Sequence, residues 1–347
     1  MSFKNLVSVL IPAYNHQKYV QETLQSIIRQ SYENIELIVI DDGSKDNTWQ
    51  KIQDMKEQCE KRFVRTIMQT KENEGTCATL NKMLDLARGD FLYFIASDDI
   101  AKPQAIQKEV EFLAKNDDCA LVVGDNELID SRGEICYWDA NRNIVYDKYR
   151  ARFTTFANFL SYSVGFDFNT DKFGRYDTTY HGNHIPNGYL VRKSIFEKIG
   201  KFTYKAPLED WWLMLQISKY AQMKFIDEIL FSYRWHDSNS IKNKEKMDNF
   251  GKMTKEYENH ILSTIDESEV LPSVLTIKSG DLKTIGIPYV LVLEKYKYEL
   301  LANANGGGAK QRLLSYLIFL SSAGQNNYNR LTANLLSSKS WGIPSAF

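Results

Sequence analysis

Two adjacent carboxylates, Asp98 and Asp99, are the residues of this sequence best suited to chemistry. They follow the apolar segment Phe91–Ile95, and a short uncharged run of this kind is typical of a strand covered on both faces in a parallel sheet. Ligands of open α/β sheets bind at the carboxyl ends of the strands. Neighbouring carboxylates repel each other unless a cation joins them, and hard divalent cations prefer oxygen ligands. The pair therefore indicates a metal-assisted binding site, with a solvated acidic turn as the simpler alternative.

The bulk composition excludes several classes of protein. The 347 residues are 43% hydrophobic and 25% charged, which is typical of a soluble globular protein. A formal net charge of -1 gives no general attraction to nucleic acid, so we expect no nucleic-acid partner. The four cysteines form no C-x-x-C pair and favour reduced thiols. Without a signal-peptide pattern or a membrane-length apolar run, the sequence predicts a cytoplasmic location and leaves open peripheral contact at the inner face of the membrane.

Strand-like and helix-like segments alternate before residue 130 and would position the carboxylates. We expect buried-type strands at residues 7–11, 35–40, 64–68, 91–95 and 119–123. Four or five β-α units in a row predict an α/β fold with a mostly parallel, doubly wound sheet and right-handed crossovers. The polar segments that follow the strands would then share one edge of the sheet. These segments are residues 12–15, 41–44, 73–75 and 97–99.

The pattern changes after Asp130. Residues 134–190 are rich in aromatic and polar side chains and show no clean period. An irregular stretch of this length inside a domain is usually a lid or a binding loop. Regular spacing returns in a helix that starts near Asp210 and in a strand-like segment, 225–233, that closes at His236.

The last third of the chain is mixed in charge and helical in character. Gly306–Gly308 is a predicted hinge, and Leu313–Leu320 forms an apolar helical stripe. We expect one domain over residues 1–240 and a helical C-terminal extension over 241–347. The extension would pack on that domain, with self-association or membrane contact as the alternatives.

The turn after the first strand excludes the common dinucleotide-binding class. A glycine-rich turn should follow that strand, but this chain has Pro12-Ala-Tyr-Asn-His-Gln17 there, and no P-loop signature occurs anywhere. A nucleotide diphosphate would therefore need a metal held by carboxylates to neutralise its charge. The same turn argues against a nucleotidyltransferase, which would need a glycine-rich, basic segment at this place.

Six short motifs, taken in order, resemble those of family 2 glycosyltransferases with the GT-A fold. They are Val9–Asn15, Val39–Thr48, Asn73-x-Gly75 with Ala78-x-x-Asn81, Ser97–Asp99, Glu209-Asp210 and Tyr233–His236. The resemblance covers roughly Val7 to Ser240, and the shared order of the motifs makes it far more specific than any one of them. The usual form of the fourth motif is D-x-D-D, and Ala96 stands at the first Asp. This departure leaves open which of Asp98 and Asp99 is the metal ligand.

The resemblance implies a catalytic domain over residues 1–240, with a donor half to about residue 130 and an acceptor half after it, and it implies a role for each matched residue. Donor binding would fall to Pro12, Tyr14, Asn15, Asp42, Asn73 and Asp98. Among these, Asp42 would accept a hydrogen bond from a uracil imide, although it could instead cap the following helix. Mn²⁺ or Mg²⁺ would be held by Asp98, Asp99 and His236. Asp210 would be the general base, with Glu209 as its rival one residue earlier.

The expected function is inverting, metal-dependent glycosyl transfer of the hexosyltransferase class. The resemblance implies a nucleotide-sugar donor, a UDP-sugar by expectation, and a hydroxyl of a glycan or lipid-linked oligosaccharide as acceptor. Assembly of a bacterial surface polysaccharide is the implied setting. The alternative is a non-catalytic sugar-binding or scaffold member of the same fold. The sequence leaves a homo-oligomer open.

Overall fold

A computed structural model describes residues 5–278 of the chain. The predicted Gly306–Gly308 hinge and the Leu313–Leu320 stripe lie outside these residues. The strands are β1 (Val7–Ala13), β2 (Ile35–Asp41), β3 (Arg65–Thr70), β4 (Phe91–Phe94), β5 (Ile100–Ala101), β6 (Cys119–Ile129), β7 (Ile135–Trp138), β8 (Ile144–Val145), β9 (Tyr189–Arg192) and β10 (Gln222–Arg234). The α-helices are α1 (Val20–Ile28), α2 (Thr48–Asp54), α3 (Lys56–Arg62), α4 (Thr76–Leu86), α5 (Ala105–Leu113), α6 (Phe156–Val164), α7 (Tyr176–Thr179), α8 (Ile195–Ile199), α9 (Glu209–Tyr220), α10 (Lys244–Thr264) and α11 (Pro272–Lys278).

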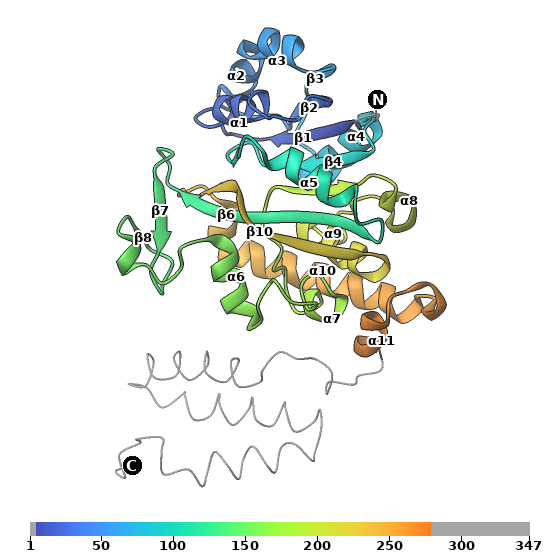
Figure 1. The fold of residues 1–347 in the computed structure, drawn as a ribbon. Helices are drawn as coiled ribbons and strands as arrows, with labels where there is room; N and C mark the ends of the chain where they lie inside the picture. Colours follow the sequence, from blue (N-terminus) through green and yellow to red (C-terminus); the bar gives the residue numbers. More distant parts are fainter. Residues whose placement is uncertain (1–4, 279–347) are drawn as a thin grey trace, which may run out of the picture. The chain divides into compact units, whose positions relative to one another are not determined.

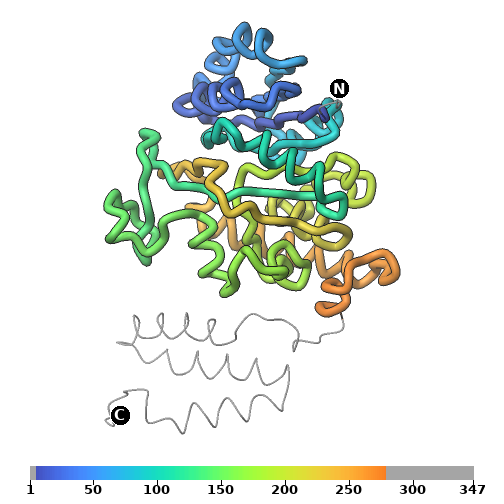
Figure 2. The backbone as a smooth tube through the Cα atoms, in the orientation of Figure 1, coloured from blue at the N-terminus to red at the C-terminus, as the bar shows by residue number. Residues whose placement is uncertain are grey.

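The strands form one mixed sheet in the order β3-β2-β1-β4-β9-β6-β10-β5, which confirms the predicted α/β fold (Figure 1). Strands β1 to β4 are parallel to one another, and β6 is parallel to β10. β9 lies antiparallel between β4 and β6, so β6 and β10 run in the same direction as β4. Figure 2 shows the backbones of β6 and β10 side by side, although they lie far apart in the sequence. The carboxyl ends of β1, β4 and β10 therefore face the same edge of the sheet.

Both faces of the sheet are covered, as the uncharged strands predicted. Alternate residues of β1 point to opposite faces, so Val9 packs with residues of α1 and α5 while Leu10 packs with residues of α4 and α9. Figure 1 shows α6, α7 and α10 gathered on the side of the β6–β10 pair away from α1. No helix in the described part of the chain is both long enough and apolar enough to span a bilayer.

The segment predicted to be irregular, residues 134–190, holds more regular structure than expected. It contains β7, β8, α6 and α7, and it enters β9 at its end. The strands are only two to four residues long and the helix α7 only four, so their sequences carry no readable period. The position of β9 inside the sheet comes from its pairing with two distant strands rather than from its own pattern.

A buried ion network joins α10 to α9 and α7. The Nζ of Lys219 lies 2.8 Å from Glu258 Oε1, and neither side chain is exposed to solvent. Glu258 also accepts hydrogen bonds from the Tyr176 hydroxyl and, at 2.8 Å, from Gln216 Nε2. The described part of the predicted C-terminal extension thus belongs to the same compact unit as the sheet.

Candidate active site

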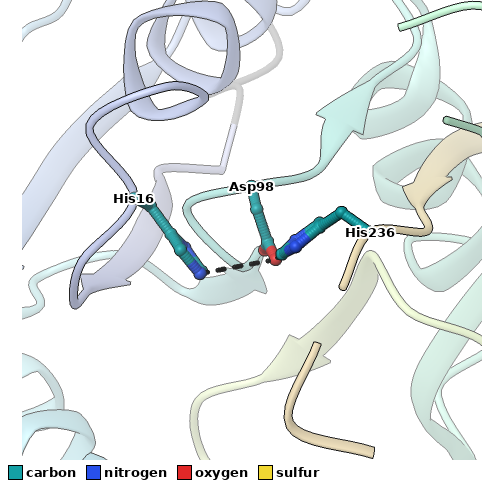
Figure 3. Close-up of side chains that lie close together, drawn as sticks. All are labelled: His16, Asp98 and His236. Atoms are coloured by element: carbon teal, nitrogen blue, oxygen red, sulfur yellow. Dashed lines mark hydrogen bonds and ion pairs between the residues drawn. The ribbon is translucent and has the colours of Figure 1, made fainter. Parts of the chain in front are cut away.

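The candidate site lies where the loops after β1, β4 and β10 meet. β1 and β4 are neighbours in the sheet, with Leu10 opposite Phe94, so the turn that follows β1 lies beside the segment that carries Asp98. The end of β10 delivers His236 to the same edge. Figure 3 shows His16, Asp98 and His236 pointing toward one another from these three elements.

The three side chains form a cluster with the composition of a metal site, which we call the His16–Asp98–His236 cluster. Their candidate ligand atoms all lie within 4.8 Å of one another. The Nε2 atoms of His16 and His236 lie 3.6 and 3.0 Å from Asp98 Oδ2. The Nδ1 atoms lie 2.8 Å from the hydroxyls of Ser97 and Ser238. A hydrogen bond at the second ring nitrogen is the usual way in which a metal-binding imidazole is oriented, so these residues fit a divalent cation.

The electrostatics of Asp98 suit a metal-binding residue, whose carboxyl must be ionised to bind a cation. Burial raises the pKa of its carboxyl, but the hydrogen bond to His236 and the charge of His16 lower it more, and the net pKa is below the usual value. Asp98 is therefore ionised at neutral pH in spite of its burial. A carboxylate in this state can bind a cation without first losing a proton.

The predicted metal ligand Asp99 lies outside this cluster. Its Oδ1 accepts a hydrogen bond from the backbone N–H of Arg234 at 2.9 Å, and it is 1% exposed. Burial and the charge of Asp98 hold its pKa well above the usual value. Arg234 also donates from Nε to the carbonyl oxygen of Asp98 at 2.7 Å. Asp99 and Arg234 together fix the end of β10 against the segment that carries Asp98.

His16 is the member of the cluster that the sequence analysis did not assign. It lies one residue after the predicted donor-binding Asn15, in the turn between β1 and α1. Its backbone N–H donates to Thr48 Oγ1 at 2.7 Å, which holds the turn against the start of α2. The sequence signal that could have identified His16 is an imidazole just after β1, the strand that pairs with β4.

The predicted donor-binding residues line the first three strand ends. Asp42 is buried, pairs with Lys71, and accepts from the backbone N–H groups of Glu74 and Gly75 at 3.0 and 2.9 Å. Burial alone would raise the pKa of Asp42, but the contacts with Lys71 and Glu74 outweigh burial, so the net pKa is below the usual value. Its carboxylate thus holds the turn after β3, and the described contacts do not include a cap on α2.

The other predicted donor contacts lie at the ends of β1 and β3. Asn15, at φ +55°, accepts from the backbone N–H of Lys45 through Oδ1 at 2.8 Å, so it ties the turn after β1 to the turn after β2. Tyr14 and Asn73 are exposed, and Pro12, inside β1, is partly buried. Tyr14 and Asn73 are therefore accessible to a ligand.

Asp210 and Glu209 are the first two residues of α9. Asp210 accepts from Trp211 N through Oδ1 at 2.6 Å and from Asn183 Nδ2 through Oδ2 at 2.9 Å. Burial raises the pKa of Asp210, and burial together with the charge of Asp210 raises the pKa of Glu209 to about 7. Burial therefore outweighs the helix N-terminus, and both carboxyls have more proton affinity than a free side chain.

Comparisons with known proteins agree with the geometry. A model of glycosyl transferase family 2 matches residues 8–200. An uncharacterized glycosyltransferase of Haemophilus influenzae is 40% identical over 36% of this chain and 38% of its own length. A putative teichuronic acid biosynthesis glycosyltransferase of Bacillus subtilis, TuaG, is 36% identical over 35% of this chain and 46% of its own length. The chain thus spans less than half of the length of these two relatives.

A solved structure shows the same fold. The mannosyltransferase PcManGT from Pyrobaculum calidifontis, in complex with GDP-Man and Mn²⁺, superposes with a TM-score of 0.54 at 14% identity. The match covers 96% of this chain and 84% of the other. The family match covers more than half of the 347 residues. The chain therefore belongs to glycosyl transferase family 2 and has the GT-A fold.

Proposed function

We propose that this chain is an inverting, metal-dependent glycosyltransferase that moves a sugar from a UDP-sugar to a hydroxyl of a glycan or lipid-linked acceptor. The observation that carries the proposal is the His16–Asp98–His236 cluster at the carboxyl edge of the sheet. Asp42, near the same edge, supports uridine because a carboxylate can accept from the imide N–H of uracil. The name of the Bacillus subtilis relative supports a role in the biosynthesis of a bacterial glycan.

Mn²⁺ is the ion that we propose for the cluster. Two imidazole nitrogens and one carboxylate oxygen make a donor set richer in nitrogen than Mg²⁺ prefers, whereas Mn²⁺ accepts such ligands. The ion would supply positive charge to the diphosphate leaving group. Support comes from PcManGT, a protein of the same fold whose structure contains GDP-Man and Mn²⁺.

Residues of the chain carry out donor binding and proton transfer. The turns after β1, β2 and β3 bind the nucleotide and orient its diphosphate toward Asp98. Asp210 accepts the proton of the acceptor hydroxyl as that oxygen attacks, and Asn183 holds the Asp210 carboxylate in place through Oδ2. An in-line displacement puts the base and the leaving group on opposite faces of the sugar, so a base outside the cluster supports inversion.

Removal of the metal should abolish transfer. The full chain would be incubated with a panel of nucleotide sugars and glycan acceptors, and release of the nucleoside diphosphate would be followed with Mn²⁺ and after chelation by EDTA. We expect release only from a UDP-sugar, loss of release in EDTA, and recovery when Mn²⁺ is added in excess. A non-catalytic sugar-binding member would release nothing with any donor, and full release in excess EDTA would contradict the metal site.

A further inference from the structure

A pocket beside the cluster has no role in the function proposed above. It has a volume of about 440 Å³ and is lined by Ser131, Arg142, Asn143, Ile144, Trp235, His236, Asp237 and Lys242. It shares His236 with the His16–Asp98–His236 cluster. Its other walls come from the segment between β6 and β8 and from the residues that follow β10. None of its lining residues belongs to the turns after β1, β2 or β3.

The turn between β7 and β8 fixes Arg142 at the pocket. Asp139 Oδ1 accepts from the backbone N–H groups of Asn141 and Asn143 at 2.8 and 2.9 Å. Arg142 has φ +63°, a left-handed conformation that is unfavourable for a non-glycine residue. The hydrogen bonds of Asp139 hold this conformation, so the position of Arg142 is built into the hairpin.

The two cations of the pocket lie on aromatic rings. The Arg142 guanidinium carbon is 5.7 Å from the Trp235 ring centroid and 5.4 Å from that of Phe159. Among residues 5–278 no carboxylate forms an ion pair with Arg142. The Lys242 Nζ is 4.6 Å from the Trp235 centroid, and its ion pair is with Asp237, at 3.3 Å, whose side chain is fully exposed. The rings orient both cations but leave their charge available to a ligand.

We propose that this pocket binds an anionic group, a phosphate or a carboxylate, of the acceptor glycan. The guanidinium fork matches either group through two parallel hydrogen bonds. The inference rests on the proposed function, because it assigns the anion to the acceptor of that reaction. The diphosphate of the donor has its own site at the cluster, and the nucleotide turns contribute nothing to the pocket.

His236 relates the pocket to the reacting groups. It lines the pocket together with Arg142, and its Nε2 lies 3.0 Å from Asp98 Oδ2 in the His16–Asp98–His236 cluster. An acceptor anchored at Arg142 is therefore held beside the proposed metal site.

Calorimetric titration with small probes tests this assignment. Glycerol 3-phosphate and methyl glucuronide would be titrated into the full chain saturated with UDP and Mn²⁺, with glycerol as the neutral control. We expect at least one charged probe to bind and glycerol not to bind. The charged probe with the lower Kd identifies whether the pocket binds a phosphate or a carboxylate. Arg142→Gln should weaken that probe roughly 10- to 100-fold, as expected for hydrogen bonds to a charged group, and leave the Kd of UDP unchanged.

Two further variants serve as controls. Lys242→Gln should weaken the same probe by a smaller factor, and Arg150→Gln, an exposed arginine outside the pocket, should leave it unchanged. The proposal is overturned if neither charged probe binds, if Arg142→Gln binds the probe as tightly as the natural chain, or if Arg142→Gln weakens UDP by the same factor. If the natural chain does not bind UDP, the proposed function fails, whereas the probe titration without UDP still tests the pocket.

Discussion

Asp210→Asn should lower turnover by roughly 10²–10⁴ while the binding of UDP and Mn²⁺ persists. Asparagine keeps the shape of the side chain and its oxygen can still accept from Trp211 N, but it cannot take the proton of the acceptor hydroxyl. Asp210 lies at the start of α9, apart from the His16–Asp98–His236 cluster, so the substitution leaves the donor site intact. Steady-state kinetics and UDP titration on the same preparation separate these two effects.

The pH dependence of turnover supplies a second readout. A general base must be unprotonated, so turnover should rise with pH through the pKa of the essential carboxyl. Burial raises that pKa in Asp210, so the natural chain should lose activity on the acid side at a higher pH than the pKa of a free aspartate would give. The residual activity of Asp210→Asn should not show this acid limb.

Glu209→Gln is the matched control. The substitution removes the carboxyl at the neighbouring position of the same helix. Glu209 is the rival base because its pKa is raised to about 7. We expect near-normal turnover in Glu209→Gln. If Glu209→Gln loses turnover and Asp210→Asn keeps it, Glu209 is the base and the assigned role moves back by one residue.

Glu258→Ala should lower the free energy of unfolding by about 3–5 kcal/mol. The substitution leaves Lys219 in a site with no solvent exposure and without its ion-pair partner, and it removes the acceptor for Tyr176 and Gln216. Burial already lowers the pKa of Lys219, and the charge of Glu258 opposes this effect. Because a neutral lysine is cheaper to bury, the loss of stability should shrink as the pH rises from neutral toward the pKa of free lysine.

Urea denaturation of two further variants tests whether the buried ion pair is the cause of the lost stability. Glu256→Ala removes an exposed ion pair with Lys252 on the same helix, and it should leave the denaturation midpoint nearly unchanged. The double variant Lys219→Met, Glu258→Leu should recover much of the loss, because it replaces the buried pair by apolar side chains. An equal midpoint for Glu258→Ala and Glu256→Ala would contradict the network. We propose on these grounds that the first part of the predicted extension folds with the catalytic domain.

The strands that form the frame of the site were predictable because each is a mostly apolar run of useful length. β1, β2 and β4 read as buried strands, and the polar residues at their ends then had to share an edge. The convergence of Asp98 and His236 followed from the family resemblance and is present in the structure. β9 was not predictable, because four residues carry no period and its place depends on pairing with strands about 70 and 100 residues away.

The assignment within the carboxylate pair needed the tertiary structure. The sequence does not distinguish Asp98 from Asp99, whereas in the structure Asp99 accepts from the backbone of Arg234 and Asp98 faces the two imidazoles. His16 was missed for a related reason. Its closeness to Asp98 depends on the register of β1 with β4 and on the hydrogen bond to Thr48, neither of which appears in the local sequence.

The central claim is that Asp98 holds a metal ion that binds the donor, and calorimetric titration of UDP tests it most directly. The natural chain should bind UDP at least about tenfold more tightly with Mn²⁺ than with EDTA. The reason is that loss of the cation that neutralises the diphosphate should raise the Kd by about tenfold or more. Asp98→Asn should lose this difference, whereas Asp99→Asn, which changes only a contact with the backbone of Arg234, should keep it. Equal UDP affinity with Mn²⁺ and with EDTA, or a metal dependence abolished by Asp99→Asn but not by Asp98→Asn, would contradict the account.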